Sequence, residues 1–181
     1  MNKILAIAGS NSTTSINQRL VEWVAGELPG QKVKVLKIGS YQIPIYSEDL
    51  ERTSGIPGQI MGIAKEIEEA TALILSVSEH NGTWSAFFKN IIDWLSRYNR
   101  NFLEHKKILL MSTSPGQRGG LTAVEHARQI LPRFSGEVVE SFSFPSFYQN
   151  FNKEMGTVTN EVLLLGLREV LTTFSQNLME S

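Results

Sequence analysis

The first segment with chemically functional side chains is rich in hydroxyl groups and follows an apolar run near the start of the chain. The run covers residues 3–8, and it is followed by Gly9, Ser10, Asn11, Ser12, Thr13, Thr14, Ser15, Ile16 and Asn17. A helical pattern begins at about Ser15, so hydroxyls and unpaired backbone N–H groups meet at a helix N-terminus. The helix dipole and these donors favour an anion. We therefore predict a phosphate-binding loop; the alternative is that the same residues only cap the helix.

Two later loops also combine glycine with polar side chains. One is Ser78-Glu79-His80-Asn81-Gly82-Thr83-Trp84-Ser85, and the other is Ser112-Thr113-Ser114-Pro115-Gly116-Gln117-Arg118-Gly119-Gly120. Asn81-Gly82 predicts a turn with positive φ, which directs backbone N–H groups outward and suits the edge of a flat heterocycle. The chain lacks both a G-x-G-x-x-G fingerprint and a Walker A lysine, which disfavours a nucleotide diphosphate or triphosphate. A surface turn with a buried Trp84 is the alternative for the first of these loops.

Alternating strand and helix patterns position the three loops. Strands are expected at 3–8, 32–38, 72–77, 107–112 and 138–142, and helices at 15–28, 59–70, 87–98, 121–131 and about 158–178. This alternation predicts an α/β fold with a parallel sheet and helices on both faces. Its size matches the flavodoxin-like three-layer sandwich with strand order 2-1-3-4-5, although periodicity alone also allows a Rossmann half. Ligands of such sheets bind beyond the carboxyl ends of the strands, which is where the loops after strands one, three and four lie.

Composition narrows the class of protein. The chain has 181 residues, 17 basic and 18 acidic side chains, three histidines and no cysteine. We expect one domain over residues 1–181, with neither nucleic-acid nor membrane binding through bulk charge. Thiolate chemistry is excluded, and no spacing among the histidines indicates a metal site. No run reaches the roughly 20 apolar residues that span a bilayer. The expected location is the cytoplasm.

The three loops together resemble the motifs of the NADPH-dependent FMN reductase family. That family opens with Gly-Ser-x-Arg-x-x-Ser-x-Asn, and Gly9, Ser10, Ser15 and Asn17 match it. Its second motif, Pro-Glu-Tyr-Asn-Gly-Ser followed by Pro-Gly and Leu-Lys-Asn-x-Ile-Asp-Trp-Leu-Ser-Arg, is similar to residues 78–97. Its third flavin-contacting segment is similar to residues 114–120.

The resemblance implies an FMN cofactor, with NADPH or NADH as electron donor and a quinone, free flavin or similar small molecule as acceptor. It implies that Ser10, Ser15 and Asn17 hold the phosphate, with Ser12 and Ile16 in the same loop. Contacts with the flavin ring are implied for Glu79, His80, Asn81, Gly82, Ser114, Pro115, Gly116 and Gly119. No side chain is expected to be a catalytic acid or base, because the flavin carries the chemistry. The resemblance further implies a homodimer or homotetramer.

Three departures from the family pattern accompany the matches. The phosphate-loop arginine is Ser12, the tyrosine is His80, and Pro-Gly is Ser85-Ala86. Loss of one charged hydrogen bond predicts FMN affinity about tenfold weaker unless another cation, such as Arg118 or Lys89, compensates. Two other functions therefore stay open: a flavodoxin-type electron carrier, which the net charge of −1 disfavours, and a family member that has lost FMN.

Two features outside the loops are ambiguous. Lys89, Asp93 and Arg97 share one helix face and predict either a solvated ion-pair ladder or an oligomer contact. The aromatic residues of 142–151 predict closure of the core or, alternatively, the rim of a neighbour's active site.

Overall fold

The computed structural model describes residues 3–28 and 30–179, which are arranged around a parallel sheet of order β2-β1-β3-β6-β7. Its strands are β1 (Lys3–Gly9), β2 (Lys32–Leu36), β3 (Ala72–Val77), β6 (Lys107–Thr113) and β7 (Glu137–Phe144). Counted among these five strands, the order is 2-1-3-4-5, so the predicted flavodoxin-like fold is confirmed. Every residue of β3 is buried, as expected for a central parallel strand covered on both faces.

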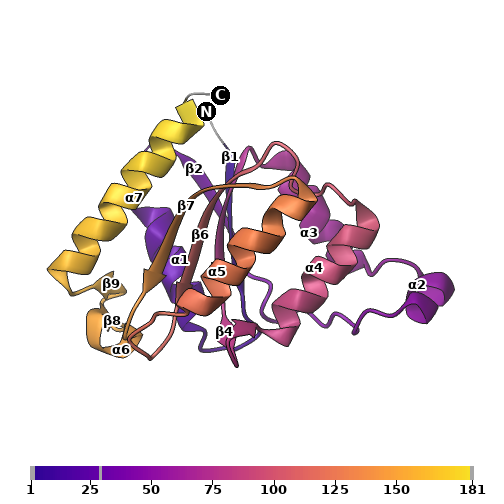
Figure 1. Cartoon of the computed structure of the whole chain (residues 1–181), viewed down its shortest axis with the longest axis horizontal. Helices are drawn as coiled ribbons and strands as arrows, with labels where there is room; N and C mark the ends of the chain where they lie inside the picture. Colours follow the sequence, from indigo (N-terminus) through magenta and orange to yellow (C-terminus); the bar gives the residue numbers. More distant parts are fainter. Residues whose placement is uncertain (1–2, 29, 180–181) are drawn as a thin grey trace.

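Helices cover both faces of the sheet (Figure 1). One face packs on α1 (Ile16–Gly26) and α7 (Glu161–Met179), and the other on α3 (Gly58–Glu69), α4 (Ala86–Tyr98) and α5 (Leu121–Ile130). Each helix turns its apolar stripe inward, which produces two separate hydrophobic clusters. Within the described residues, no helix has the length and apolar character needed to cross a membrane.

Strand register brings the carboxyl ends of β1, β3 and β6 to one edge. Gly9 pairs with Val77 between β1 and β3, and Ser76 pairs with Met111 between β3 and β6. The strands run downward in Figure 1, so this edge lies at the bottom of the view. Because strand order reverses between β1 and β3, this edge is where the fold places ligands.

Several short elements that the sequence pattern does not predict complete the fold. These are α2 (Glu48–Ser54), the hairpin of β4 (Glu79–His80) and β5 (Thr83–Trp84), the 3₁₀ turn Leu131–Phe134, α6 (Phe147–Asn150), and the hairpin of β8 (Phe151–Asn152) and β9 (Thr157–Val158). These elements have two to four residues, apart from α2, which has seven residues but buries none of them, so hydrophobic periodicity does not reveal them.

The aromatic residues after β6 mainly close the core. Phe144, Phe147 and Phe151 are buried, and the rings of Phe147 and Phe151 stack with centroids 4.7 Å apart. Tyr148 is exposed. Of the two interpretations given above, core closure accounts for three of these side chains without a second copy of the chain.

Candidate functional site

The loop after β1 is tied to the neighbouring strands by the buried side chain of Asn17. Its Oδ1 accepts hydrogen bonds from Ser76 Oγ at 2.7 Å and from the Thr113 backbone N–H at 3.0 Å. Its Nδ2 donates to the Thr113 carbonyl at 3.1 Å. One amide thus joins the start of α1 to β3 and to the end of β6. Oδ1 and one Nδ2 hydrogen are used within the protein, so the predicted phosphate contact of Asn17 would have to come from its backbone N–H or its second Nδ2 hydrogen.

Two more side chains fix the loop after β3. Glu79 Oε2 accepts from the Ala123 backbone N–H at 3.1 Å, so its carboxylate caps the N-terminus of α5. Ser85 caps α4 by accepting from the Phe88 N–H, and its hydroxyl donates to the Gly9 carbonyl at 2.9 Å. Ser85 stands where the family motif has proline, and here it binds the second loop to the first.

A cavity of about 460 Å³ adjoins the first loop. It is lined by Ser10, Ser12, Thr13, Thr14, Ser15, Gln18, Arg19, Glu22, Lys37, Gly39 and Ser40. Among the described residues, the backbone N–H groups of Thr13, Ile16 and Asn17 make no hydrogen bond, while Ser15 Oγ accepts from the Gln18 N–H. Hydroxyls, free N–H groups and two cations are the donors that a phosphate monoester requires. The donor set therefore fits the phosphate of FMN.

The second loop is a tight hairpin whose turn faces outward. Asn81 and Gly82 have φ of 53° and 75°, which confirms the predicted positive-φ turn. Their N–H groups find no acceptor in the described part of the chain. His80 is exposed on this hairpin. Trp84 is buried and donates to the Ala123 carbonyl, so the surface-turn interpretation is correct for this tryptophan.

The third loop is held by the segment that follows β7. The Ser146 N–H donates to the Gly116 carbonyl at 2.9 Å, and the Phe147 N–H donates to the Ser114 carbonyl at 3.1 Å. Gly119 has φ of 58°, and a Cβ there would lie 2.6 Å from the Phe144 carbonyl carbon. Gly119 is thus required by packing, whereas Ser114, Pro115 and Gly116 are at least partly accessible.

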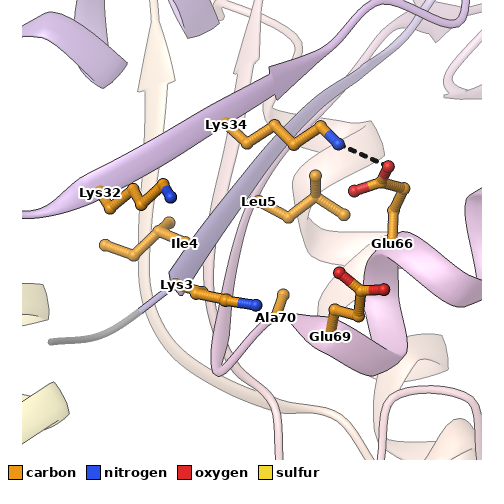
Figure 2. A pocket seen from close by; sticks show the side chains of 8 residues that line it. All are labelled: Lys3, Ile4, Leu5, Lys32, Lys34, Glu66, Glu69 and Ala70. Atoms are coloured by element: carbon orange, nitrogen blue, oxygen red, sulfur yellow. Dashed lines mark hydrogen bonds and ion pairs between the residues drawn. The ribbon is translucent and has the colours of Figure 1, made fainter.

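A second hollow lies at the other edge of the sheet (Figure 2). Its lining residues are Lys3, Ile4, Leu5, Lys32, Lys34, Glu66, Glu69 and Ala70. Lys3 and Lys32 begin β1 and β2, so this hollow is at the amino ends of the strands, away from the edge where such folds bind ligands. Lysines on β2 have an ordinary function, since β2 is an edge strand and charged side chains discourage pairing with other chains.

The structure gathers the predicted phosphate residues Ser10, Ser12 and Ser15 around one cavity. The cavity is also lined by Lys37, Arg19 and Glu22, which were not predicted as site residues. Lys37 falls within the strand expected at 32–38, and Arg19 and Glu22 fall within the helix expected at 15–28. Neither Lys89 nor Arg118, the suggested substitutes for the family arginine, lines the cavity; Lys89 pairs with Asp93 at 2.6 Å. Within the described residues, no group of three or more potential metal ligands is present.

Comparisons with known proteins find similarity to quinone reductases and FMN reductases. A quinone reductase of Escherichia coli K12 is 30% identical over 144 residues, which are 74% of this chain and 72% of that protein. An NAD(P)H-dependent FMN reductase of Pseudomonas aeruginosa is 31% identical over 130 residues, covering 71% of this chain and 69% of that protein. The flavoenzyme NAD(P)H:(acceptor) oxidoreductase FerB of Paracoccus denitrificans shares the fold at a TM-score of 0.79 and 24% identity, covering 99% and 98% of the two chains.

The family itself is shown by a model of NADPH-dependent FMN reductases, which matches residues 2–149. This match covers most of the chain and includes all three loops. It confirms the resemblance seen in the motifs and the expectation of a flavin-dependent oxidoreductase. The chain belongs to the NADPH-dependent FMN reductase family.

Proposed function

We propose that this protein is an FMN-dependent NAD(P)H oxidoreductase that passes hydride through bound flavin to a quinone, free flavin or similar small acceptor. The observation that carries the proposal is the joining of three donor-rich loops at the carboxyl edge of the sheet. Asn17, Glu79 and Ser85 make the joining hydrogen bonds. Such a preformed rim orients a ligand without a large ordering cost.

The residues of the rim divide into two groups. Ser10, Ser12 and Ser15, with the N–H groups at the start of α1, would hold the phosphate. The ring would lie against residues 79–82 and 114–119, where outward N–H groups stabilise charge that develops on reduction. The chemistry that FMN supplies when bound is acceptance of a hydride from NAD(P)H and its transfer, with a proton, to the acceptor.

No side chain of the rim is assigned as a catalytic acid or base. The Glu79 carboxylate is occupied by the N-terminus of α5, and His80 is exposed to solvent. We therefore assign to the protein the orientation of the flavin. Quinone is the first acceptor to test, because the name of the E. coli relative refers to it.

The proposal also covers the domain, the cellular location and the oligomeric state of the protein. We propose one FMN-binding domain over residues 1–181 and a cytoplasmic location, and the family resemblance supports a homodimer or homotetramer. Light scattering behind size-exclusion chromatography measures the assembly directly.

The first experiment tests whether the protein binds FMN. Purified protein is mixed with FMN and desalted, and the retained flavin is measured by absorbance. We expect about one flavin per chain, and NADPH oxidation that requires both FMN and a soluble benzoquinone. Flavin retention without NADPH oxidation would identify an electron carrier. Absence of any retained or titratable flavin would identify a family member that has lost FMN, and would overturn the proposal.

A further inference from the structure

The first loop, residues 9–17, contains no lysine or arginine. The cavity beside this loop is nevertheless lined by positively charged side chains from other segments. The family motif places arginine at position 12, where this chain has serine. Arg19 and Lys37 are the cations among the described residues that line the cavity, and Glu22 is the carboxylate. Two cations and one carboxylate leave the cavity with a net charge of +1, the charge that the family arginine would have contributed.

Lys37 reaches the cavity because the chain after β2 packs on the first loop. A Cβ placed on Gly39 would lie 3.1 Å from the Ser10 carbonyl oxygen, so the two backbones are close. Two residues before Gly39, the Lys37 ammonium lies 2.7 Å from Glu22 Oε1. Glu22 is on α1 and also lines the cavity, so this ion pair holds the lysine at the cavity wall.

Arg19 approaches from α1, one turn after the cap Ser15. Arg19 lines the cavity beside the first loop, and together with Glu22 it also lines a neighbouring hollow formed with Trp23, Phe151 and Gly156. Its Nη1 donates to the Lys153 carbonyl at 3.4 Å, and it forms no ion pair with any carboxylate of the described ranges. Its charge is therefore available to an anion.

We propose that Arg19 and Lys37 jointly bind the phosphate of FMN in place of the arginine missing at position 12, with Glu22 positioning Lys37. The inference rests on the proposed function and names the residues that determine its cofactor affinity. Glu22 has two opposite effects: it orients the lysine, and its own charge repels the phosphate. Charge dominates at this exposed site, so removing the carboxylate strengthens FMN binding.

Titration of flavin fluorescence with apoprotein tests the assignment, and riboflavin separates the phosphate from the ring because it lacks phosphate. Lys37→Gln and Arg19→Gln are each expected to weaken FMN binding by about five- to tenfold. Riboflavin affinity should stay unchanged in both variants. Glu22→Gln should strengthen FMN binding by about two- to fivefold. Ser12→Arg should restore FMN affinity in the Lys37→Gln background.

The chain contains a control lysine three residues before Lys37. Lys34 on β2 pairs with Glu66 at 2.5 Å, but it lines the hollow at the opposite edge of the sheet (Figure 2). Lys34→Gln removes the same charge from another exposed lysine that is paired with a glutamate, and it should leave FMN affinity unchanged. Lys37→Arg should also keep affinity, because it retains the cation.

The possible outcomes distinguish failure of the proposed function from failure of the phosphate assignment to Arg19 and Lys37. If wild-type protein binds neither flavin, the proposed function fails. If it binds FMN and the affinity is the same in Lys37→Gln and Arg19→Gln, the proposed function stands and the present inference is wrong. Equal losses of FMN and riboflavin affinity would also contradict it, since the effect would then not involve phosphate.

Discussion

The Ser76 hydroxyl donates a 2.7 Å hydrogen bond to Asn17 Oδ1 across the boundary between α1 and the sheet, and both side chains are buried. Oδ1 also accepts from Thr113, so both of its lone pairs are used. An asparagine that matches the phosphate-loop motif is therefore a structural link between three elements. The spacing of two neighbouring loops depends on it.

Asn17→Ala should destabilise the fold by about 2–4 kcal/mol, because it leaves Ser76 and both backbone groups of Thr113 without partners in a buried place. Ser76→Ala should cost only about 1 kcal/mol, since Asn17 keeps its bonds to Thr113. Urea unfolding measures both values. As a control, Asn11→Ala changes an exposed asparagine of the same loop and should have little effect.

Flavin binding should distinguish this link from a phosphate contact. If Asn17 acts only through the fold, folded Asn17→Ala protein should lose FMN and riboflavin affinity by the same factor. A loss confined to FMN would show that the side chain reaches the phosphate, contrary to the geometry.

Restoring the family's proline at position 85 should harm this protein. The Ser85 N–H donates to the Ser78 carbonyl at 3.0 Å, and its hydroxyl both caps α4 and binds the Gly9 carbonyl. Its φ of −58° suits proline, so the loss comes only from hydrogen bonds. Ser85→Ala should cost about 1–2 kcal/mol and Ser85→Pro more. Equal stability of Ser85→Pro and wild type would contradict this account.

Much of the fold could be predicted because local patterns and global structure agree. The strand runs such as residues 72–77 are apolar throughout, and each long helix has an apolar stripe, so the alternation indicates a parallel sheet. The Asn81-Gly82 turn was predictable for the same reason, since few residue pairs accept its φ values. The number and size of the elements matched the order 2-1-3-4-5, and the structure excludes the Rossmann half that periodicity left open.

The sequence predicted the three loops and their meeting at the carboxyl ends of the strands, but it did not predict the residues that other segments bring to the first loop. The hydroxyls of residues 10–15 form one motif, but Lys37 joins them through a contact between separate loops. Likewise, Arg97 was expected to continue a ladder with Lys89 and Asp93, yet it pairs with Glu51 of α2 at 2.9 Å. No helical spacing encodes a partner that lies 46 residues away.

Gly9 has no room for a side chain because the Phe88 ring packs against it. A Cβ at this position would lie 2.5 Å from Phe88 Cδ2, and its backbone does not adopt a positive φ. Gly9→Ala should therefore destabilise the protein by about 1–3 kcal/mol through overpacking alone. Phe88→Leu replaces the aromatic ring with a smaller side chain, so in the double variant it should relieve much of the cost of Gly9→Ala. Thermal unfolding of the four proteins measures the coupling; strictly additive effects would indicate another cause.

The Glu51 carboxylate of α2 should make the stability of the protein depend on pH. Glu51 accepts from Arg97 Nε at 2.9 Å and from the Tyr46 hydroxyl at 3.0 Å, and Tyr46 packs edge-on against Trp94. The Arg97 guanidinium, with a smaller contribution from Tyr46, lowers the pKa of Glu51 below its ordinary value of 4.5. These contacts attach α2 to α4.

Because the pKa of Glu51 is lower in the folded state, its contribution to stability is complete above pH 4.5 and is lost as pH falls through the folded value. Wild type should thus be more stable than Glu51→Gln at neutral pH, by the small amount typical of an exposed ion pair, and the difference should vanish on acidification. Urea unfolding across this range measures it. In an Arg97→Gln background the lowering of the Glu51 pKa should largely disappear, and an unchanged acid dependence there would assign the effect to a different carboxylate.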